Sequence, residues 1–320
     1  ASKVVQNGSN FFLSGGAMYY SLYAYEEPLY VAREDDIVLV SYPCSGVHWV
    51  QQMVQLILNS GQSARTYGEF MRRTPVMELA GVKQGSDEEI ALSGPRTLRT
   101  HFQILRAGGT SHSKAKYVYV ARNPWDCCVS LYHRIKSSKP ASFVPRTFDE
   151  YFKIFVEGKF SFGEYFDHVL CGYDRREDPN VFFVTFEDLK ADREAVALKL
   201  AYFLGEKYGD ALEHRGVFAN VCEKSSFEYM REVYGAPVGV PDTTCAVPST
   251  VPERVHASYI RNEDQFCRIL RSGKVNDWKG HFTLDHRDRM QEKIAEKTKG
   301  SSLMSLWKLE SKYKCLATSL

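Results

Sequence analysis

The alternation of short apolar runs with segments of helical periodicity is the feature that most constrains how this chain can fold. Runs rich in β-branched and aromatic residues occupy positions 36–42, 97–101, 116–121 and 181–186. Unbroken apolar runs of this length are typical of strands buried on both faces, as in parallel sheets. Segments with helical spacing of apolar residues follow three of them, at positions 47–58, 124–135 and 193–204. This order predicts an α/β fold with one parallel β-sheet flanked by helices.

The length of the chain fits one large domain. At 320 residues it can bury a sizeable core, and no internal repeat interrupts it. Residues 234–258 are rich in Pro, Gly, Ser and Thr, and we interpret them as a lid loop rather than a linker. A charged segment with a helical pattern follows at 285–312. We therefore expect a single domain over residues 1–320.

Composition limits the partners that the protein can have. A net charge of +2 is too small to favour a nucleic-acid or membrane surface, but it leaves room for a local basic pocket. No apolar run approaches the ~20 residues that span a bilayer, and the first residues lack a signal-peptide core. The eight cysteines form no C-x-x-C pair, which argues for reduced thiols and against a zinc site. We expect a cytoplasmic protein without a metal, a nucleic-acid partner or a membrane anchor.

The segment 43–49 joins the first apolar run to the first helical segment through a short loop that contains Gly46. In such a strand–loop–helix unit, backbone N–H groups converge and the helix dipole favours negative charge. The loop is not a Walker A loop, because the pattern G-x-x-x-x-G-K-[ST] is absent. An ordinary turn between a strand and a helix would share these features, so this segment alone leaves both interpretations open.

Four motifs in order carry a family resemblance. YPCSGVHW at 42–49 resembles the YPKSGTTW 5′-phosphosulfate loop of the cytosolic sulfotransferases. Three more segments match the same family: RTH at 99–101 for KTH, RNPWDCCVS at 122–130 for RNxxDxxVS, and RSGKVNDWK at 271–279 for RKGxxGDWK. The resemblance implies a P-loop-like sulfotransferase fold and metal-free transfer from 3′-phosphoadenosine 5′-phosphosulfate (PAPS). The product would be adenosine 3′,5′-bisphosphate (PAP).

The chain departs from the family pattern at several motif positions. The departures are Cys44 for lysine, Val47 and His48 for threonines, Arg99 for lysine, Phe186 for tyrosine, Ser272 for lysine and Asn276 for glycine. The resemblance therefore supports the fold and the ligand class more than it supports turnover.

The chemistry of the reaction points to three catalytic candidates. An in-line sulfuryl transfer needs positioning and charge stabilisation, together with a base for the acceptor proton. His101 is the candidate base, because imidazole titrates near neutrality, and the resemblance implies the same role; a buried structural histidine is the alternative. Arg99 keeps one cation nearby, and His48 would add another if it were protonated.

Cys44 is the third candidate, because it stands where the family has a lysine that neutralises charge on the leaving phosphate. A neutral thiol cannot do this, and losing one such group typically costs ~10²–10³ in rate. The pKa of a thiol near a helix N-terminus tends to fall, which would make Cys44 redox-sensitive. An inert residue that only fills space is the other interpretation.

The resemblance also implies residues that bind the donor. Arg122 and Ser130 would bind the 3′-phosphate, through a guanidinium fork and a hydroxyl. Trp49 and Phe227 would stack on adenine, as aromatic residues do, or would serve only as core residues. The full set of predicted donor-binding residues is Ser45, Gly46, Val47, His48, Trp49, Arg122, Ser130, Phe186, Ser225, Phe227, Arg271, Ser272 and Gly273.

The sequence indicates the acceptor and the oligomeric state less clearly than it indicates the donor site. Tyr19, Val76, Met77 and Phe143 are candidate walls for a phenol, a catecholamine or another small alcohol or amine, with ordinary core packing as the alternative. Residues 279–288 resemble the family's KxxxTVxxxE dimer segment, which would pair across a two-fold axis, or they form a solvated loop.

Three functions remain open from the sequence. The first is an active sulfotransferase. The second is a catalytically weak or inactive homologue that binds PAP as a sensor or scaffold, which the absence of lysine at position 44 motivates. The third is a P-loop kinase or nucleotidase, against which the missing Walker lysine and the residues for an adenosine 3′-phosphate argue.

Overall fold

The computed structural model describes most of the predicted core of the chain. The described residues are 13–14, 17–18, 33–77, 95–105, 107, 114–138, 145–160, 162–234 and 270–307. Tyr19, Phe143 and residues 235–258 of the expected lid lie outside them.

The centre of the structure is a four-stranded sheet in the order β4-β3-β5-β6, in which every neighbouring pair is parallel. Its strands are β3 (Ile37–Ser41), β4 (Thr97–Thr100), β5 (Lys116–Ala121) and β6 (Val181–Thr185). Each begins and ends within one residue of its predicted range, which confirms the predicted parallel sheet. A separate antiparallel pair joins β1 (Leu13–Ser14) and β2 (Ala17–Met18).

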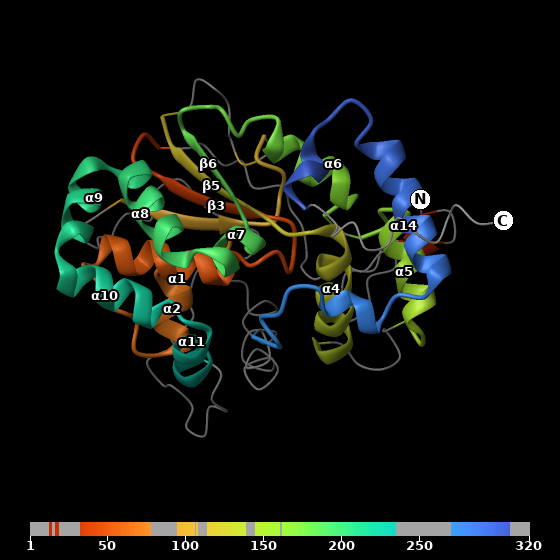
Figure 1. The fold of residues 1–320 in the computed structure, drawn as a ribbon, viewed down its shortest axis with the longest axis horizontal. Helices are drawn as coiled ribbons and strands as arrows, with labels where there is room; N and C mark the ends of the chain where they lie inside the picture. Colours follow the sequence, from red (N-terminus) through yellow and green to blue (C-terminus); the bar gives the residue numbers. More distant parts are fainter. Residues whose placement is uncertain are drawn as a thin grey trace.

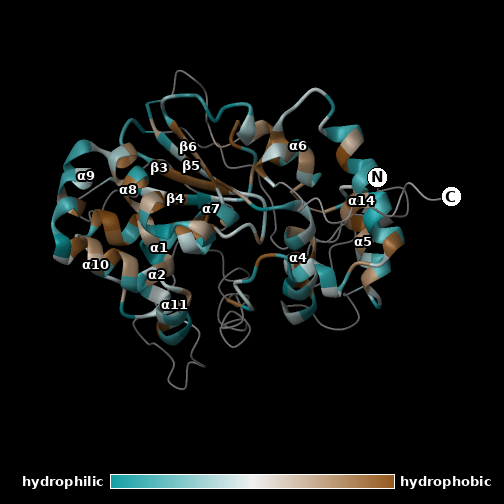
Figure 2. Ribbon diagram, in the orientation of Figure 1, coloured by the Kyte–Doolittle hydropathy of each residue, from teal (hydrophilic) through white to brown (hydrophobic). Residues whose placement is uncertain are grey.

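Both faces of the sheet are buried, which explains why its strands read as unbroken apolar runs. Leu39 and Val118 belong to one hydrophobic cluster, whereas Val40 and Tyr119 belong to another, and all four are fully buried. Successive side chains of a strand point to opposite faces, so the two clusters mark two layers of helices. Figure 2 shows the central strands as strongly hydrophobic segments.

The helices of the first layer are α1 (Val47–Leu58), α7 (Phe186–Ala191), α8 (Arg193–Leu204), α9 (Glu206–Glu213) and α10 (Arg215–Lys224), with α2 (Tyr67–Arg72) and α11 (Phe227–Tyr234) beside them. Helices α1, α8, α9 and α10 contact one another and gather at one end of the molecule in Figure 1. Polar N-caps set where these helices begin: Thr185 forms a capping box with Asp188 at α7, and Asp192 accepts from the N–H of Ala195 at α8.

The second layer contains α4 (Pro124–Ser138), α5 (Phe148–Val156), α6 (Tyr165–Tyr173) and α14 (Leu284–Lys297), with the short 3₁₀ helices η2 (Asp277–Gly280) and η3 (Leu303–Leu306). Figure 1 shows α4, α5 and α14 at the opposite end from α9. The helical pattern predicted for 285–312 is broken within the described range, because α14 ends at Lys297 and Gly300 adopts a φ of 81°. A glycine in this left-handed conformation is typical of a residue just beyond a helix end.

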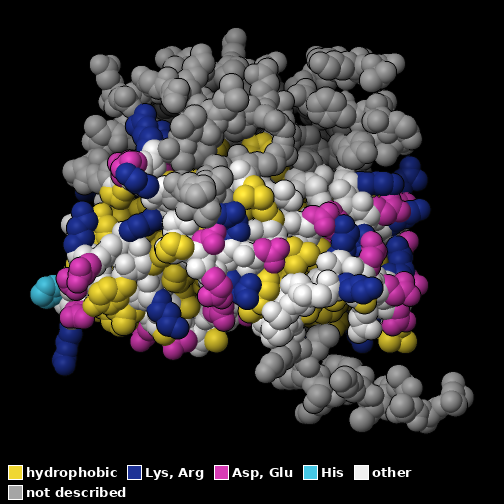
Figure 3. Space-filling model, turned by 90° about the horizontal axis from the view of Figure 1, so that it is seen from above, with side chains coloured by type: hydrophobic (Ala, Val, Ile, Leu, Met, Phe, Trp, Pro, Cys, Tyr) yellow, Lys and Arg dark blue, Asp and Glu magenta, His cyan; other side chains and the backbone are white. Residues whose placement is uncertain are grey.

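The described surface carries charges of both signs. Figure 3 shows Lys and Arg side chains interspersed with Asp and Glu over the face that it presents. Among the described helices, none combines the length and the apolar character needed to cross a lipid bilayer.

Candidate functional site

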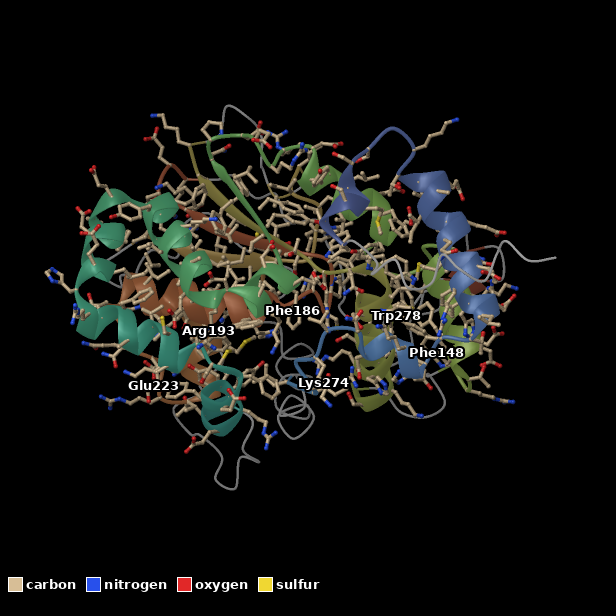
Figure 4. All side chains as sticks on the ribbon, viewed as in Figure 1. Phe148, Phe186, Arg193, Glu223, Lys274 and Trp278 are labelled. Atoms are coloured by element: carbon tan, nitrogen blue, oxygen red, sulfur yellow. The ribbon has the colours of Figure 1, made fainter. Side chains whose placement is uncertain are left out.

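A pocket of about 340 Å³ lies at the carboxyl edge of the sheet, and every strand delivers a residue to it. Pro43 stands two residues beyond the end of β3, while His101, Arg122 and Phe186 directly follow β4, β5 and β6. Open parallel sheets bind ligands at this edge, because there the loops that follow the strands converge. Figure 4 shows Phe186 near the centre of the molecule, between the helices around α1 and helix α4.

Most of the predicted site residues line this one pocket. They are Cys44, Gly46, Val47, His48, Trp49, Arg99, His101, Arg122, Ser130, Phe186, Phe227, Arg271, Ser272 and Gly273. The structure thus brings together segments that are up to about 230 positions apart in the chain, as their residue numbers show.

Four predicted residues lie behind the pocket walls instead. The hydroxyl of Ser45 is fully buried, 3.7 Å from the sulfur of Cys127. Ser225 is also fully buried, and its carbonyl oxygen accepts a 2.8 Å hydrogen bond from the indole N–H of Trp49. Val76 and Met77 are buried in hydrophobic clusters. Ser225 therefore orients Trp49 through its backbone, a role that the sequence did not indicate.

The loop after β3 has the backbone geometry of an anion cradle. Cys44 and Gly46 both adopt left-handed conformations, with φ of 66° and 106°. A Cβ on Gly46 would stand 2.8 Å from a ring carbon of Phe186, so both the conformation and the space require glycine there. Gly46 is the N-cap of α1, and no side chain among the described residues caps that helix start. The first N–H groups of α1 are thus available to a bound anion.

The described part of the pocket is strongly basic, although the whole chain is nearly neutral. Its lining includes four arginines and one lysine, and none of the described acidic side chains lines it. These cations are Arg99, Arg122, Arg134, Arg271 and Lys190. Such a concentration of one sign of charge in a concave site attracts polyanions.

Arg122 is directed into the pocket by several contacts. Its guanidinium donates to the carbonyl oxygens of Cys44 (3.3 Å) and Lys274 (3.0 Å), and it lies 4.3 Å over the ring of Phe186. Its Nε atom is buried and has no partner among the described residues. A buried donor in this state is costly unless a ligand completes its hydrogen bonding, which fits a bound phosphate.

Other predicted donor-binding residues line the same pocket as this guanidinium. The hydroxyl of Ser130 hydrogen-bonds the thiol of Cys44, and Arg271 forms an ion pair with Asp277. A Cβ on Gly273 would stand 2.8 Å from the ring of Phe227, so this ring packs directly on the glycine backbone. Cys44, Ser130, Arg271 and Phe227 all line the pocket.

His101 has the tautomer that a general base needs. Its Nδ1 lies 2.9 Å from the carbonyl oxygen of Ser41, which can only accept, so Nδ1 carries the proton and Nε2 does not. Burial lowers the pKa of His101 to about 3, with further lowering by Arg99, His168 and Arg134 against the effect of the Ser41 bond. Nε2 of His168 in turn bonds the carbonyl oxygen of His101 at 3.0 Å. The imidazole is therefore neutral at physiological pH and held through both its ring and its backbone.

Arg99 is the buried cation next to this histidine. It is 3% exposed, and its guanidinium donates to Oε1 of Gln51 (2.7 Å) and contacts the sulfur of Met71 (3.6 Å). Its Nε atom has no partner within the described residues.

The expectation that His48 could add a cation is not supported by its surroundings. Burial lowers the pKa of His48 well below its usual range, and the charges of Arg99 and Arg134 lower it further. Its Nε2 is buried without a partner among the described residues, while its ring stacks on Phe70 at 6.3 Å. His48 is thus a neutral polar group in the pocket wall.

The thiol of Cys44 also stays uncharged. Burial raises its pKa, and this effect outweighs the opposing charges of Arg134 and Arg122 and the bond from Ser130. The pKa of Cys44 therefore does not fall as expected at a helix N-terminus. Desolvation destabilises the thiolate more than the nearby positive charges stabilise it.

Sequence reasoning missed several pocket residues on α4. His133, Arg134 and Ser137 line the pocket together with Ser130, at the spacing i, i+3, i+4 and i+7. This spacing places side chains on one face of a helix, so it could have extended the site beyond the motif that ends at Ser130. Nε2 of His133 lies 2.8 Å from Nε2 of His281, and burial lowers the pKa of His133 to about 4.

One cluster outside the pocket has the residue types of a metal site. Ligand atoms of Asp149, Asp285 and His286 lie within 4.8 Å of one another. The guanidinium of Arg289 is 3.4 Å from Asp149 and 3.2 Å from Asp285, so a cationic side chain already offsets part of the charge of these carboxylates.

The fold and the pocket together define a class of protein: an α/β protein with a left-handed loop before an uncapped helix start, a polycationic pocket and a neutral histidine at a strand end. Comparisons with known proteins identify the family within this class. A family model described as the sulfotransferase domain matches residues 34–302. Sulfotransferase 1C2 of Rattus norvegicus is 34% identical over 277 residues, which cover 85% of this chain and 86% of that protein. Sulfotransferase 1C2 of Homo sapiens is 30% identical with the same coverage. The chain belongs to the sulfotransferase family, as its motifs predicted.

Solved structures agree with this assignment at the level of the fold. Mouse sulfotransferase SULT7A1, complexed with PAP, superimposes with a TM-score of 0.66 at 22% identity, over 92% of this chain and 98% of that one. Retinol dehydratase in a complex with retinol and PAP gives a TM-score of 0.64 at 20% identity, over 85% and 83% of the two chains. The predicted sulfotransferase fold is confirmed.

Proposed function

We propose that this protein transfers the sulfuryl group of PAPS to a hydroxyl or amine of a small acceptor. The observation that carries the proposal is the pocket itself, where a left-handed anion loop, several arginines and the unprotonated Nε2 side of His101 meet. Family membership and the PAP that is bound in the related mouse structure support the choice of donor.

In this proposal the 3′-phosphate of the donor binds at Arg122, Ser130 and Arg271. The buried Nε of Arg122 would gain the partner that it lacks among the described residues. Trp49, fixed by the Ser225 carbonyl, and Phe227, packed on Gly273, would hold the adenine between them.

The 5′-phosphosulfate end would then lie on the loop that contains Cys44 and Gly46. The acceptor oxygen or nitrogen forms a bond to sulfur, while the bond from sulfur to the 5′-phosphate oxygen breaks. Nε2 of His101 takes the acceptor proton. Because the donor is a polyanion, its charge would oppose the charges of Arg99 and Arg134, which add to the lowering of the His101 pKa by burial.

The acceptor is proposed to be small and aromatic, such as a phenol or a catecholamine. Val76 and Met77 are buried near Arg99, where Val76 forms a β-bridge, and they would form only the base of an acceptor site. The other two candidate wall residues, Tyr19 and Phe143, lie outside the described residues.

We also propose that the segment 279–288 pairs two copies of the chain. Leu284, at the start of α14, is 75% exposed, which is unusual for a large apolar side chain within a charged segment. An isologous contact around a two-fold axis would bury the Leu284 side chain of each copy.

A second candidate function is a PAP-binding homologue with little or no turnover. The observation that favours it is the absence of charge on both Cys44 and His48 in the phosphosulfate loop. Such a protein would keep the nucleotide site and lose the charge that supports the leaving group.

One experiment separates these functions. Pure protein is incubated with PAPS labelled in the sulfuryl group and a panel of phenols, catecholamines, aliphatic alcohols and amines, while PAP affinity is measured by calorimetry. Labelled product supports the enzyme, and tight PAP binding without product supports the sensor. Release of phosphate from ATP without either result would contradict both.

A further inference from the structure

Arg134 lies on the face of α4 that borders the pocket, one helical turn beyond Ser130. It is half-buried, and it contributes the largest charge effect on the thiol of Cys44, ahead of Arg122 and Arg271. Its charge also lowers the pKa of His48 and of His101. Arg134, Cys44, His48 and His101 all line the same pocket, so the guanidinium, the loop and the histidine at the end of β4 face one cavity.

The other arginines of the pocket have described contacts of their own. Arg99 donates to Gln51, and Arg271 pairs with Asp277. Arg122 donates to the carbonyl of Lys274 and lies over Phe186. Arg122 also donates to the carbonyl oxygen of Cys44, so it contacts the loop through the loop's backbone.

The loop needs a positive charge that its own side chains do not supply. Cys44 and His48 are both uncharged, since burial raises the pKa of the first and lowers that of the second. During sulfuryl transfer, negative charge builds up on the oxygen that bridges sulfur and the 5′-phosphate, and backbone N–H groups carry only partial charges.

We propose that Arg134 is a catalytic residue of this protein, which binds the phosphosulfate end of the donor and stabilises the charge on the leaving oxygen. This inference rests on the proposed function. The guanidinium donates to the bridging oxygen as the bond from that oxygen to sulfur breaks. The electron pair of this bond stays on the 5′-phosphate, and the acceptor proton goes to Nε2 of His101.

The test compares Arg134→Gln and Arg134→Lys with the wild type in single-turnover transfer from PAPS. Lys136→Gln is the matched control, because Lys136 is an exposed cation on the same helix. The expected result is a loss of ~10²–10³ in the rate of transfer for Arg134→Gln, with partial retention in Arg134→Lys and little change in the control.

Binding without acceptor gives a readout that does not depend on turnover. The affinity for PAPS, measured by competition against PAP, should fall several-fold more than the affinity for PAP, which lacks the sulfuryl group. Adding Cys44→Lys to Arg134→Gln should restore part of the rate, because two cations at one site share a task.

The outcomes separate this inference from the function on which it rests. A wild-type protein that neither binds PAP nor transfers sulfuryl groups overturns the proposed function, and the inference falls with it. If the wild type is active, a transfer rate for Arg134→Gln within twofold of wild type overturns the inference alone. An equal loss of PAP and PAPS affinity, or a loss confined to acidic acceptors, also overturns it, because Arg134 would then bind another part of the complex.

Discussion

The guanidinium of Arg122 lies 4.3 Å over the ring of Phe186, and the same ring leaves no space for a side chain on Gly46. Phe186 thus joins the end of β5 to the loop that follows β3. Four testable consequences follow from this site and its neighbours.

Replacing Arg122 by alanine should weaken PAP binding strongly. Hydrogen bonds to charged groups contribute about 1.5–3 kcal/mol, which corresponds to a loss of roughly 10- to 100-fold in affinity. Calorimetry would measure this change, with Arg122→Lys as a variant that keeps the charge but loses the fork. Equal affinities of the wild type and Arg122→Ala would remove the basis for the nucleotide site.

His101→Ala should abolish transfer and leave PAP affinity nearly unchanged. The base must be unprotonated, and burial lowers the pKa of His101 to about 3 in the free protein. The group therefore loses its function only as the pH falls towards that value, so kcat/KM should show no loss near pH 6.5 from this residue. An acidic limb of kcat/KM with a midpoint near 6.5 in the wild-type protein would contradict this environment.

Gly46→Ala should destabilise the protein and weaken donor binding together. The new Cβ would meet Phe186 at 2.8 Å, and a φ of 106° is unfavourable for alanine. A cost of about 1–3 kcal/mol is expected for such a strained position, measurable by chemical denaturation. In a Phe186→Ala background the clash is gone but the backbone strain remains, so adding Gly46→Ala there should cost less stability than it costs in the wild type.

Cys44 should react slowly with alkylating reagents at neutral pH. Burial raises the pKa of its thiol, and only the thiolate is nucleophilic. Peptide mapping after a timed exposure to iodoacetamide would give its rate relative to Cys222, which is also half-buried. Modification of Cys44 much faster than that of Cys222 would favour the redox-sensitive interpretation.

The central sheet could be predicted from the sequence because its signal is local. The apolar runs that contain Val38, Val118 and Val184 read as buried strands, and the motif residues Arg122 and His101 stand directly at strand ends. The local sequence pattern was therefore sufficient to predict both the strands and the residues that directly follow them.

The charge states of the pocket could not be predicted in the same way. Position next to a helix start suggested a lowered pKa for Cys44, but desolvation depends on the packing of this side chain against a hydrophobic cluster built from distant parts of the chain. The side chains of Ser45 and Ser225 likewise point behind the pocket, because each meets a partner far away in the sequence or in a neighbouring turn. Arg134 carried no motif signal, and only its spacing from Ser130 connects it with the site.

The parallel register of β3 and β4 fixes the position of His101 relative to the loop that follows β3. Val40 lies opposite Thr100, so the loop that begins at Tyr42 and the imidazole of His101 start from the same level of the sheet. Each residue of a strand advances the chain by about 3.3 Å and turns its side chain to the other face. An insertion or deletion of a single residue inside β4 would therefore move the imidazole by about one such step and point it into the opposite helical layer. The distance between the loop and the imidazole is therefore set by the number of residues in the two paired strands. Side-chain substitutions on either strand can change the packing of the core without changing this distance.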